Sequence, residues 1–553
     1  METETKQKIR LNTMAIILII ILCIGISPKT LQNDTYYTIK IGEYVLENGI
    51  TMVDPFSWHE NLEYTFPHWL YDVMIYSIYN IGGMLGVYIS TIVFASILGI
   101  VMYFVNVKLC KNRILSFALT IISLILLKPY ICARAQLVTF ILFILTIYFI
   151  EMYLDTKKKR YIVGLVIIPI LIANLHTATF FFYFILYLPY IAEYISYILI
   201  YADVVICEAV QKSLNKKLEK NGESEKLLKK IEKEEKRHKK LKERADAKIE
   251  NPYKIKVTYK ETTRVLILIF IICLLTGFLT PIGTTPYTYL IKTMQGISTK
   301  NISEHLPLVL SENRNLLILL AVYITLIAFT KIKIRISDVF MLGGLVLLAI
   351  FTRRQTSMIY LIGCIILNRL LTQLINNYND KIIKKVEKLA SSIIGIAVIS
   401  VIIILISLLA YKAKKDDDFI DGNTYPVQAI QWLKENLDIN SIRIYNEYNY
   451  GSYFIYQNIP VFIDSRCDLY MPEFNENMYA FRDFLRLNDV KDSNETVENK
   501  FEEYGFTHFV VTNTSRIKRY LEERPEKYNK IYPTEEISDD RFSIFERISK
   551  NEE

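Results

Sequence analysis

The sequence predicts an α-helical membrane protein that crosses the bilayer about eleven times and ends in a soluble α/β domain. Hydrophobic residues make up 52% of the chain. They fall in runs of about 17 to 25 residues, the length that a membrane-spanning helix needs. Because backbone groups in hydrocarbon must satisfy their own hydrogen bonds, these runs are expected to be helices rather than the short alternating strands of a barrel.

The first apolar run, 11–27, follows three basic residues, as in a signal peptide. Its end, Gly-Ile-Ser at 25–27, matches a small-x-small cleavage site poorly, and the run is long for a cleaved signal. We therefore predict a retained helix that anchors the N-terminus.

The net charge of +8 lies in short connections between apolar runs and in one long insert. Membrane topology explains this distribution better than nucleic-acid binding does, because basic connections stay in the cytoplasm. The basic segments are 108–113, 157–160, the insert 208–263, 331–335 and 381–388. With these inside, the N-terminus is cytoplasmic and everything after about position 412 is outside.

Two long connections then lie outside, 28–82 and 281–313, within a transmembrane domain predicted to span 1–411. The segment 67–81 is too short to span comfortably. Its Trp and Tyr residues prefer the headgroup region, so we predict a helix at the outer surface. The insert 208–263 is Lys/Glu-rich with loosely spaced leucines, which predicts a cytoplasmic helical hairpin or a single charged helix. It is either a solvated linker or a docking site for a partner or anionic lipid headgroups.

The last part of the chain, 412–553, has the pattern of a soluble extracytoplasmic α/β domain. Helices are predicted at 426–436, 473–486, 494–504 and 515–523, and strands at 442–445, 461–463, 507–511, 528–532 and 542–545.

The seven cysteines are scattered, without a CxxC pair. Neither a disulfide framework nor structural zinc is therefore expected. A histidine with a single carboxylate is weak evidence for a metal site. We therefore predict no metal site and no cofactor, with a divalent cation as the alternative.

The most informative stretch is the first outer loop, in which acids, histidines and aromatic residues alternate. Its motifs are Asn33-Asp34-Thr35-Tyr36-Tyr37, Asp54-Pro55-Phe56-Ser57-Trp58 and Pro67-His68-Trp69-Leu70. Related motifs are Ala133-Arg134-Ala135-Gln136, Ile302-Ser303-Glu304-His305-Leu306-Pro307, Thr352-Arg353-Arg354, Asn449-Tyr450-Gly451-Ser452-Tyr453 and Phe462-Ile463-Asp464-Ser465-Arg466-Cys467-Asp468-Leu469-Tyr470. Together they resemble the GT-C superfamily of polyprenyl-phosphate-sugar-dependent glycosyltransferases. The resemblance is to the protein O-mannosyltransferase and aminoarabinose transferase type, in a poorly characterised bacterial branch with a C-terminal extracytoplasmic domain.

The resemblance implies an inverting glycosyltransferase at the outer face of a bacterial cytoplasmic membrane. Its partners would be the bilayer, a polyprenyl-phosphate-sugar donor and an unknown cell-envelope acceptor, with no nucleic acid. Such a transfer needs a carboxylate to take the proton of the acceptor hydroxyl. Asp34 is our first candidate and Asp54 the second. The departing phosphate needs fixed positive charge, for which Arg134, Arg353 and Arg354 are the candidates.

Six further residues are candidates for acceptor binding or for an accessory role: His68, His176, Glu304, His305, Asp464 and Arg466. Most of these candidates have a competing structural interpretation. Asp34 and Asp54 each have the look of a helix N-cap, and the arginines could extend to lipid headgroups. His68 and Trp69 resemble interfacial anchors. His176 resembles a turn residue whose hydrogen bonds are satisfied. Asp464 and Arg466 resemble an internal ion pair.

Two other classes of function compete with the enzyme. One is a transporter or flippase for a lipid-linked saccharide, and the other is a non-catalytic envelope-assembly protein. Transporters place their charged sites near the bilayer midplane and often contain inverted repeats. Here the notable charges cluster at one face, which favours the enzyme. The sugar and the acceptor depend on pocket shape and cannot be predicted from these motifs.

Overall fold

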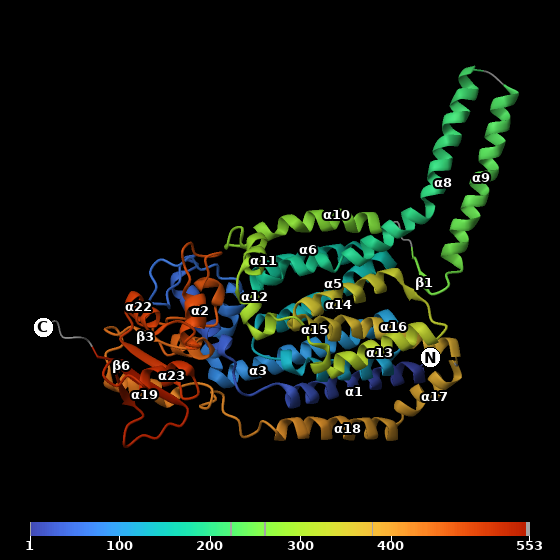
Figure 1. Ribbon diagram of the computed structural model, residues 1–553. Helices are drawn as coiled ribbons and strands as arrows, with labels where there is room; N and C mark the ends of the chain where they lie inside the picture. Colours follow the sequence, from blue (N-terminus) through green and yellow to red (C-terminus); the bar gives the residue numbers. More distant parts are fainter. Residues whose placement is uncertain (1, 222–223, 259–261, 379, 549–553) are drawn as a thin grey trace.

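The computed structural model describes residues 2–221, 224–258, 262–378 and 380–548. Long helices form a bundle, and a small sheet with short helices lies at one end of it (Figure 1). In the described residues, seven helices are long and apolar enough to cross a membrane: Thr5–Ile26, Trp69–Cys110, Arg113–Tyr130, Ala135–Thr156, Thr177–Lys220, Arg353–Asn377 and Ile393–Lys412. Three shorter apolar helices are Thr263–Phe278, Arg314–Phe329 and Ile336–Phe351. The predicted class, a helical membrane protein with several spans, is confirmed, while the count of eleven stays a prediction.

The bundle helices pack their apolar side chains into one core. They are α1 (Glu2–Ile26), α3 (Trp69–Cys110), α4 (Arg113–Leu127), α5 (Ala135–Thr156), α6 (Lys159–Leu175), α7 (Phe180–Ile185), α8 (Leu188–Asn221), α10 (Thr263–Leu274), α13 (Arg314–Phe329), α14 (Ile336–Phe351), α15 (Thr356–Met358), α16 (Cys364–Tyr378) and α18 (Ile393–Lys412). A π-helical turn at Ile359–Gly363 joins α15 to α16.

The charge pattern and the structure agree on which segments share an end of the bundle. The N-terminus, α17 (Asp380–Ala390) and the insert lie at one end. At the other end lie α2 (Asn33–Asn48), α11 (Thr285–Gln295), α12 (Ser298–Asn301) and the sheet (Figure 1). Which end faces the cytoplasm stays a prediction.

The insert is a helical hairpin, the first of its two predicted forms. α8 extends beyond the bundle and packs against α9 (Glu225–Glu250), which runs back beside it. The chain then forms β1 (Ile255–Lys256), which pairs in parallel with β2 (Ile334–Arg335) at the start of α14.

The helix α3 is divided at Gly83, whose φ of 57° is left-handed and accessible to glycine at little cost. The part before the bend packs on α2, and its Tyr71 and Ile75 belong to the core of the sheet-bearing end. The part after the bend contributes Leu98 and Met102 to the bundle core. The segment predicted at 67–81 is thus a helical piece distinct from the long span that follows it.

The C-terminal sheet has the strand order β3-β4-β6-β5. β3 (Ile444–Tyr445) is parallel to β4 (His508–Thr512), while β6 (Phe542–Arg547) is antiparallel to both β4 and β5 (Tyr528–Tyr532). The surrounding helices are α19 (Val427–Asn436), α20 (Gly451–Tyr456), α21 (Ala480–Asn488), α22 (Asn494–Tyr504) and α23 (Arg516–Glu522). These elements confirm a small α/β domain.

Two predicted elements of this domain are wrong. Segment 461–463 is not a sheet strand, because the Asn446 side chain takes up the Phe462 N–H and the Ile463 carbonyl. The helix predicted over 473–486 begins only at Ala480. Before that point, the Asn475 side chain bonds to both backbone groups of Glu63 in the first outer loop.

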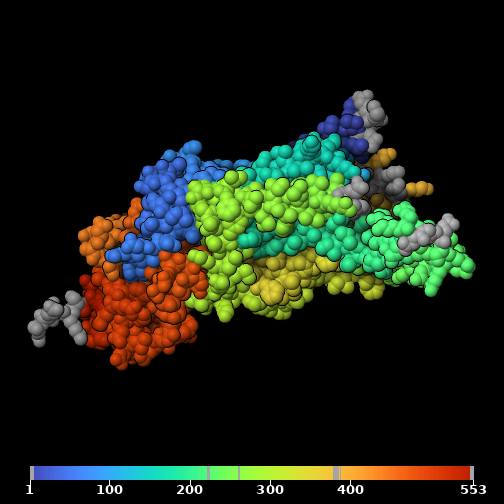
Figure 2. Space-filling model, turned by 90° about the horizontal axis from the view of Figure 1, so that it is seen from above, coloured from blue at the N-terminus to red at the C-terminus, as the bar shows by residue number. Residues whose placement is uncertain are grey.

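The first outer loop and the C-terminal domain share one hydrophobic core. Tyr36 of α2 meets Tyr425 and Tyr453 edge-on, with ring centroids 5.0 and 5.3 Å apart. Trp58 of the first outer loop stacks on Phe462 of the C-terminal domain. In Figure 2 these two parts of the chain, blue and orange-red, lie against each other at one end of the molecule.

Candidate active site

Charged side chains from four separated segments meet at the sheet-bearing end of the bundle. Asp34 in the first turn of α2 lies 3.0 Å from a terminal nitrogen of Arg134, which directly precedes α5. The other terminal nitrogen of Arg134 lies 3.3 Å from Glu304, in the short helical turn Ser303–His305. On the far side of Glu304, at 3.9 Å, is Arg354, in the turn Arg353–Gln355 that leads into α15. We call Asp34, Arg134, Glu304 and Arg354 the outer charge cluster.

Contacts of its two neighbours in the sequence with distant segments hold Asp34 in place. The N-cap position of α2 is taken by Gln32 rather than by Asp34, so the competing interpretation of Asp34 as the cap does not apply. The Thr35 hydroxyl donates to the Ala133 carbonyl at 3.3 Å and brings α2 to the entry of α5. Asn33 donates to the Tyr448 carbonyl of the C-terminal domain at 3.2 Å. Asp34 therefore meets Arg134 through packing between distant segments.

Neighbouring charges favour the ionised forms of Arg134 and Glu304. Burial opposes the charge of Arg134, but Asp34, Glu304 and other neighbouring groups together outweigh it, so the pKa of the guanidinium is raised. Burial likewise opposes the charge of Glu304, but Arg134 and then Arg354 lower the pKa of this carboxyl. In the described part of the chain, the Nε of Arg134 is buried without a hydrogen-bond partner. A buried donor of this kind favours an additional acceptor.

Two predicted histidines lie near the outer charge cluster, in opposite electrostatic settings. Burial lowers the pKa of His68, but Asp72 at 2.7 Å outweighs it, so the net pKa is raised. The other ring nitrogen of His68 lies 3.2 Å from the Tyr37 hydroxyl. The pKa of His176 falls well below its ordinary value, first because of burial and then because of Arg354. Its Nδ1 lies 2.8 Å from the Thr139 hydroxyl.

Sequence reasoning missed Tyr37 and Asp72 as partners of His68. The spacing of four residues between His68 and Asp72, at the start of a helix, was an available signal for their contact. No comparable signal marked Tyr37, which lies on a different helix.

The second candidate base, Asp54, lies elsewhere. Its carboxylate is 2.6 Å from Arg466, which also bonds to Asp464 at 2.7 Å, and all three side chains are at most 3% exposed. Asp54 also accepts from the Ser57 N–H at 2.9 Å. Burial favours the neutral acid, but Arg466 outweighs it and holds the pKa of Asp54 below its usual value. These residues match the internal ion pair and turn cap that competed with the catalytic interpretation.

The remaining two candidates are at the edge of the site. Arg353 pairs loosely with Glu312 at 3.9 Å and is 43% exposed, so it points away from the outer charge cluster. His305 follows Glu304 directly, and burial, followed by Arg354, lowers its pKa.

A cavity of about 70 Å³ lies beside these residues, between the two outer loops and the C-terminal domain. Its lining includes Tyr37, His68, Tyr289, Arg466 and Asp468. Tyr289 donates to Asp468, whose pKa is raised by burial. The cavity is therefore polar and is built from three segments of the chain.

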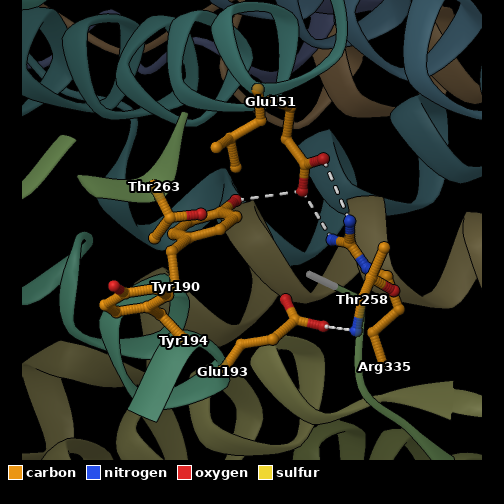
Figure 3. A pocket seen from close by; sticks show the side chains of 8 residues that line it. Glu151, Tyr190, Glu193, Tyr194, Thr258, Thr263 and Arg335 are labelled. Carbon is orange, nitrogen blue, oxygen red and sulfur yellow. Dashed lines mark hydrogen bonds and ion pairs between the residues drawn. The ribbon is translucent and has the colours of Figure 1, made fainter. Parts of the chain in front are cut away.

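A second ionic cluster lies at the other end of the bundle (Figure 3). Glu151 of α5 accepts from Arg335 at 2.5 and 3.0 Å and from Tyr190 at 3.0 Å. Arg369 of α16 joins it at 3.1 Å. The adjoining cavity holds only about 20 Å³, room for about one water molecule. This cluster therefore joins helices rather than enclosing a ligand.

Among the described residues, no group of three or more His, Cys, Asp and Glu side chains is placed to hold a metal ion.

The long apolar helices define a polytopic membrane protein, with the outer charge cluster at one end of its bundle. Comparison of the sequence with protein-family models and with curated proteins finds no match. The structure is similar to the crystal structure of an Archaeoglobus fulgidus oligosaccharyltransferase tethered to an acceptor peptide containing the NVT sequon. The TM-score is 0.53 at 10% identity, over 91% of this chain and 69% of that one. At this identity the similarity shows the fold alone, the GT-C fold that the sequence resembles.

Proposed function

We propose that this protein is a membrane glycosyltransferase that moves a sugar from a polyprenyl-phosphate donor to an acceptor at the sheet-bearing end of the bundle. The observation that carries the proposal is the contact between Asp34 and Arg134, with Glu304 and Arg354 beside it. An acid and two guanidinium groups close together at one end of the bundle supply what transfer from a phosphate-linked sugar requires. The GT-C fold supports the same class of reaction.

The reaction is a single displacement with inversion at the anomeric carbon. The acceptor hydroxyl oxygen attacks this carbon, and the bond from the carbon to the phosphate oxygen breaks, so polyprenyl phosphate leaves with the electron pair. The hydroxyl proton passes to Asp34. Arg134 and Arg354 bind the phosphate oxygens and stabilise their growing negative charge, with Arg353 at the edge of the site.

The ion pair between Asp34 and Arg134 makes base activation depend on the donor. Without a donor, Arg134 is paired with both Asp34 and Glu304. A bound phosphate competes for the same guanidinium, and its incoming charge weakens the contact to Asp34. The carboxylate then becomes available to the acceptor. Binding of the donor thus precedes proton removal.

The acceptor binds in the polar cavity next to Tyr37, where His68 and the C-terminal domain meet. His176 and His305 lie near Arg354 and take an accessory role, and no metal is assigned to the reaction. We propose a cell-envelope glycan, lipid or protein as the acceptor, in a bacterial cytoplasmic membrane with the C-terminal domain outside. The acceptor peptide of the oligosaccharyltransferase belongs to that protein.

The test is sugar transfer by the full chain in membranes supplied with polyprenyl-phosphate-linked sugar and an envelope extract. Asp34→Asn should lower transfer by about 10²- to 10⁴-fold, the range for loss of a general base. Expression and membrane insertion should be retained. Glu47→Gln, an exposed acid at the other end of α2, is the matched control and should leave transfer unchanged. An Asp34→Asn protein with full activity refutes the assignment.

A further inference from the structure

The hairpin of α8 and α9 presents a one-sided basic surface that the proposed reaction does not use. α9 carries eleven Lys and Arg residues against seven Asp and Glu residues, a net charge of +4. The two helices pack against each other. The Cys207 thiol donates to the Glu234 carbonyl at 3.5 Å, and the Tyr201 hydroxyl donates to Asp246 at 2.5 Å. The charges left outside are therefore available to a partner.

One face of α9 is basic along its whole length. Its residues follow one another at intervals of three or four, which places them in a single stripe on a helix. They are Lys226, Lys230, Lys233, Arg237, Lys240 and Arg244, and all six are exposed. The acids lie on other faces of the helix, and one of them, Glu234, reaches Arg237 of this face at 3.5 Å. We call these six residues the basic stripe.

The helix α8 carries an apolar stripe at the base of the hairpin. It consists of Ile195, Leu199, Ala202, Ile206 and Val210, again at intervals of three or four. Leu199 is 69% exposed and Ile206 is 60% exposed, although both are large apolar residues. This stripe continues the lipid-facing surface of the bundle into the hairpin.

The direction of the hairpin fits a membrane surface. It leaves the end of the bundle at a steep angle to the bundle helices, so it runs across their direction rather than along it (Figure 1). A helix pair with this direction lies beside the headgroups of the bilayer that the bundle crosses. In Figure 2 the same green segment lies at the end opposite the C-terminal domain.

We infer that the hairpin binds the surface of the membrane leaflet at this end, with the basic stripe on anionic lipid headgroups and the apolar stripe of α8 in the headgroup boundary. Clustered basic side chains next to a membrane-spanning segment are attracted by anionic lipids within about a Debye length. The occupant is a lipid surface rather than a nucleic acid or an acidic protein, because the apolar stripe needs a partner of low polarity.

The experiment measures how close the hairpin tip lies to the membrane in the full-length protein. Ser224→Cys at the tip takes a donor fluorophore selectively, because all seven native cysteines are buried. The protein is reconstituted in vesicles of phosphatidylcholine alone, or of three parts phosphatidylcholine to one part phosphatidylglycerol, each with a headgroup-labelled acceptor lipid. Energy transfer should be severalfold stronger with phosphatidylglycerol and should fall to the phosphatidylcholine level in high salt.

Two double variants with the same change in charge separate a specific face from total charge. Lys230→Gln with Lys233→Gln, on the basic stripe, should abolish the gain from phosphatidylglycerol. Lys239→Gln with Lys242→Gln, off the stripe, should retain it. Equal transfer in both vesicle types overturns the inference, as does an equal loss in both variants. A hairpin that responds only to added RNA or to an acidic peptide also overturns it.

Discussion

Arg134 contacts Asp34 and Glu304 at the same time, at 3.0 and 3.3 Å, and so joins the two outer loops at the end of the bundle. Each carboxylate comes from a different loop, and the guanidinium between them stands at the entry of α5. The position of the candidate base therefore depends on a side chain that is itself a candidate for binding the donor phosphate.

Two substitutions of Arg134 should separate the contribution of its positive charge from that of its two-pronged contact. Arg134→Gln should lower sugar transfer by about 10²- to 10³-fold, because a preorganised positive group is lost. Arg134→Lys should retain part of the rate, since an ammonium keeps the charge but not the two-pronged contact. Transfer rates over a range of donor concentrations are the measurement. A wild-type rate in Arg134→Gln would remove Arg134 from the site.

Asp54 should matter for stability rather than for chemistry. Asp54→Asn leaves Arg466 partly unpaired in a buried position, and breaking such a pair costs about 3–5 kcal/mol. The thermal unfolding temperature of the purified protein should fall, while the rate of the remaining folded fraction should hold. Glu60→Gln, an exposed acid in the same loop, is the matched control and should leave the unfolding temperature unchanged. Loss of transfer without loss of stability would return Asp54 to the catalytic candidates.

The contact between the first outer loop and the C-terminal domain should weaken in acid, because Asp54 then becomes protonated. The folded pKa of Asp54 lies below its ordinary value of 3.8, so its contribution to stability is complete above that value. The contribution is lost as the pH falls through the folded pKa. The protection of the amides at 54–64 against hydrogen exchange, relative to the unfolded chain at each pH, should be constant from neutral pH down to about pH 4 and should fall below it. A fall in protection already near pH 6 would assign the contact to another group.

Gly42 should be required for the approach of α2 to α3. A Cβ at this position would lie 2.2 Å from the backbone carbonyl oxygen of Asp72, so the helices would have to separate. Gly42→Ala should destabilise the protein by about 1–3 kcal/mol, the range for overpacking. It should also lower transfer, because α2 carries Asp34. A Cβ at Gly82 meets open space among the described atoms, so Gly82→Ala should be tolerated in both measurements. Equal behaviour of the two variants would contradict this packing argument.

The sequence predicted elements well where a local property decides the structure. The long apolar runs form helices. The charged insert forms a helical hairpin, and the apolar residues on its inner face recur at helical spacing. Prediction failed at 461–463 and 473–479, where side chains of Asn446 and Asn475 bond to backbone groups of distant segments. Such hydrogen bonds replace those of a strand ladder or a helical turn, and no local sequence pattern predicts them.

The candidate residues show the same division. By itself, the sequence determined that acids and arginines lie at the ends of apolar helices, because charge is excluded from hydrocarbon. Asp34 and Asp54 look alike in this respect, since both follow the first span and precede aromatic residues. Only the tertiary structure decided that Asp34 meets Arg134 at 24% exposure while Asp54 is enclosed with Arg466. The reason is physical: the partner of a charge is set by the packing of segments far apart in the chain, and neither hydropathy nor spacing encodes that packing.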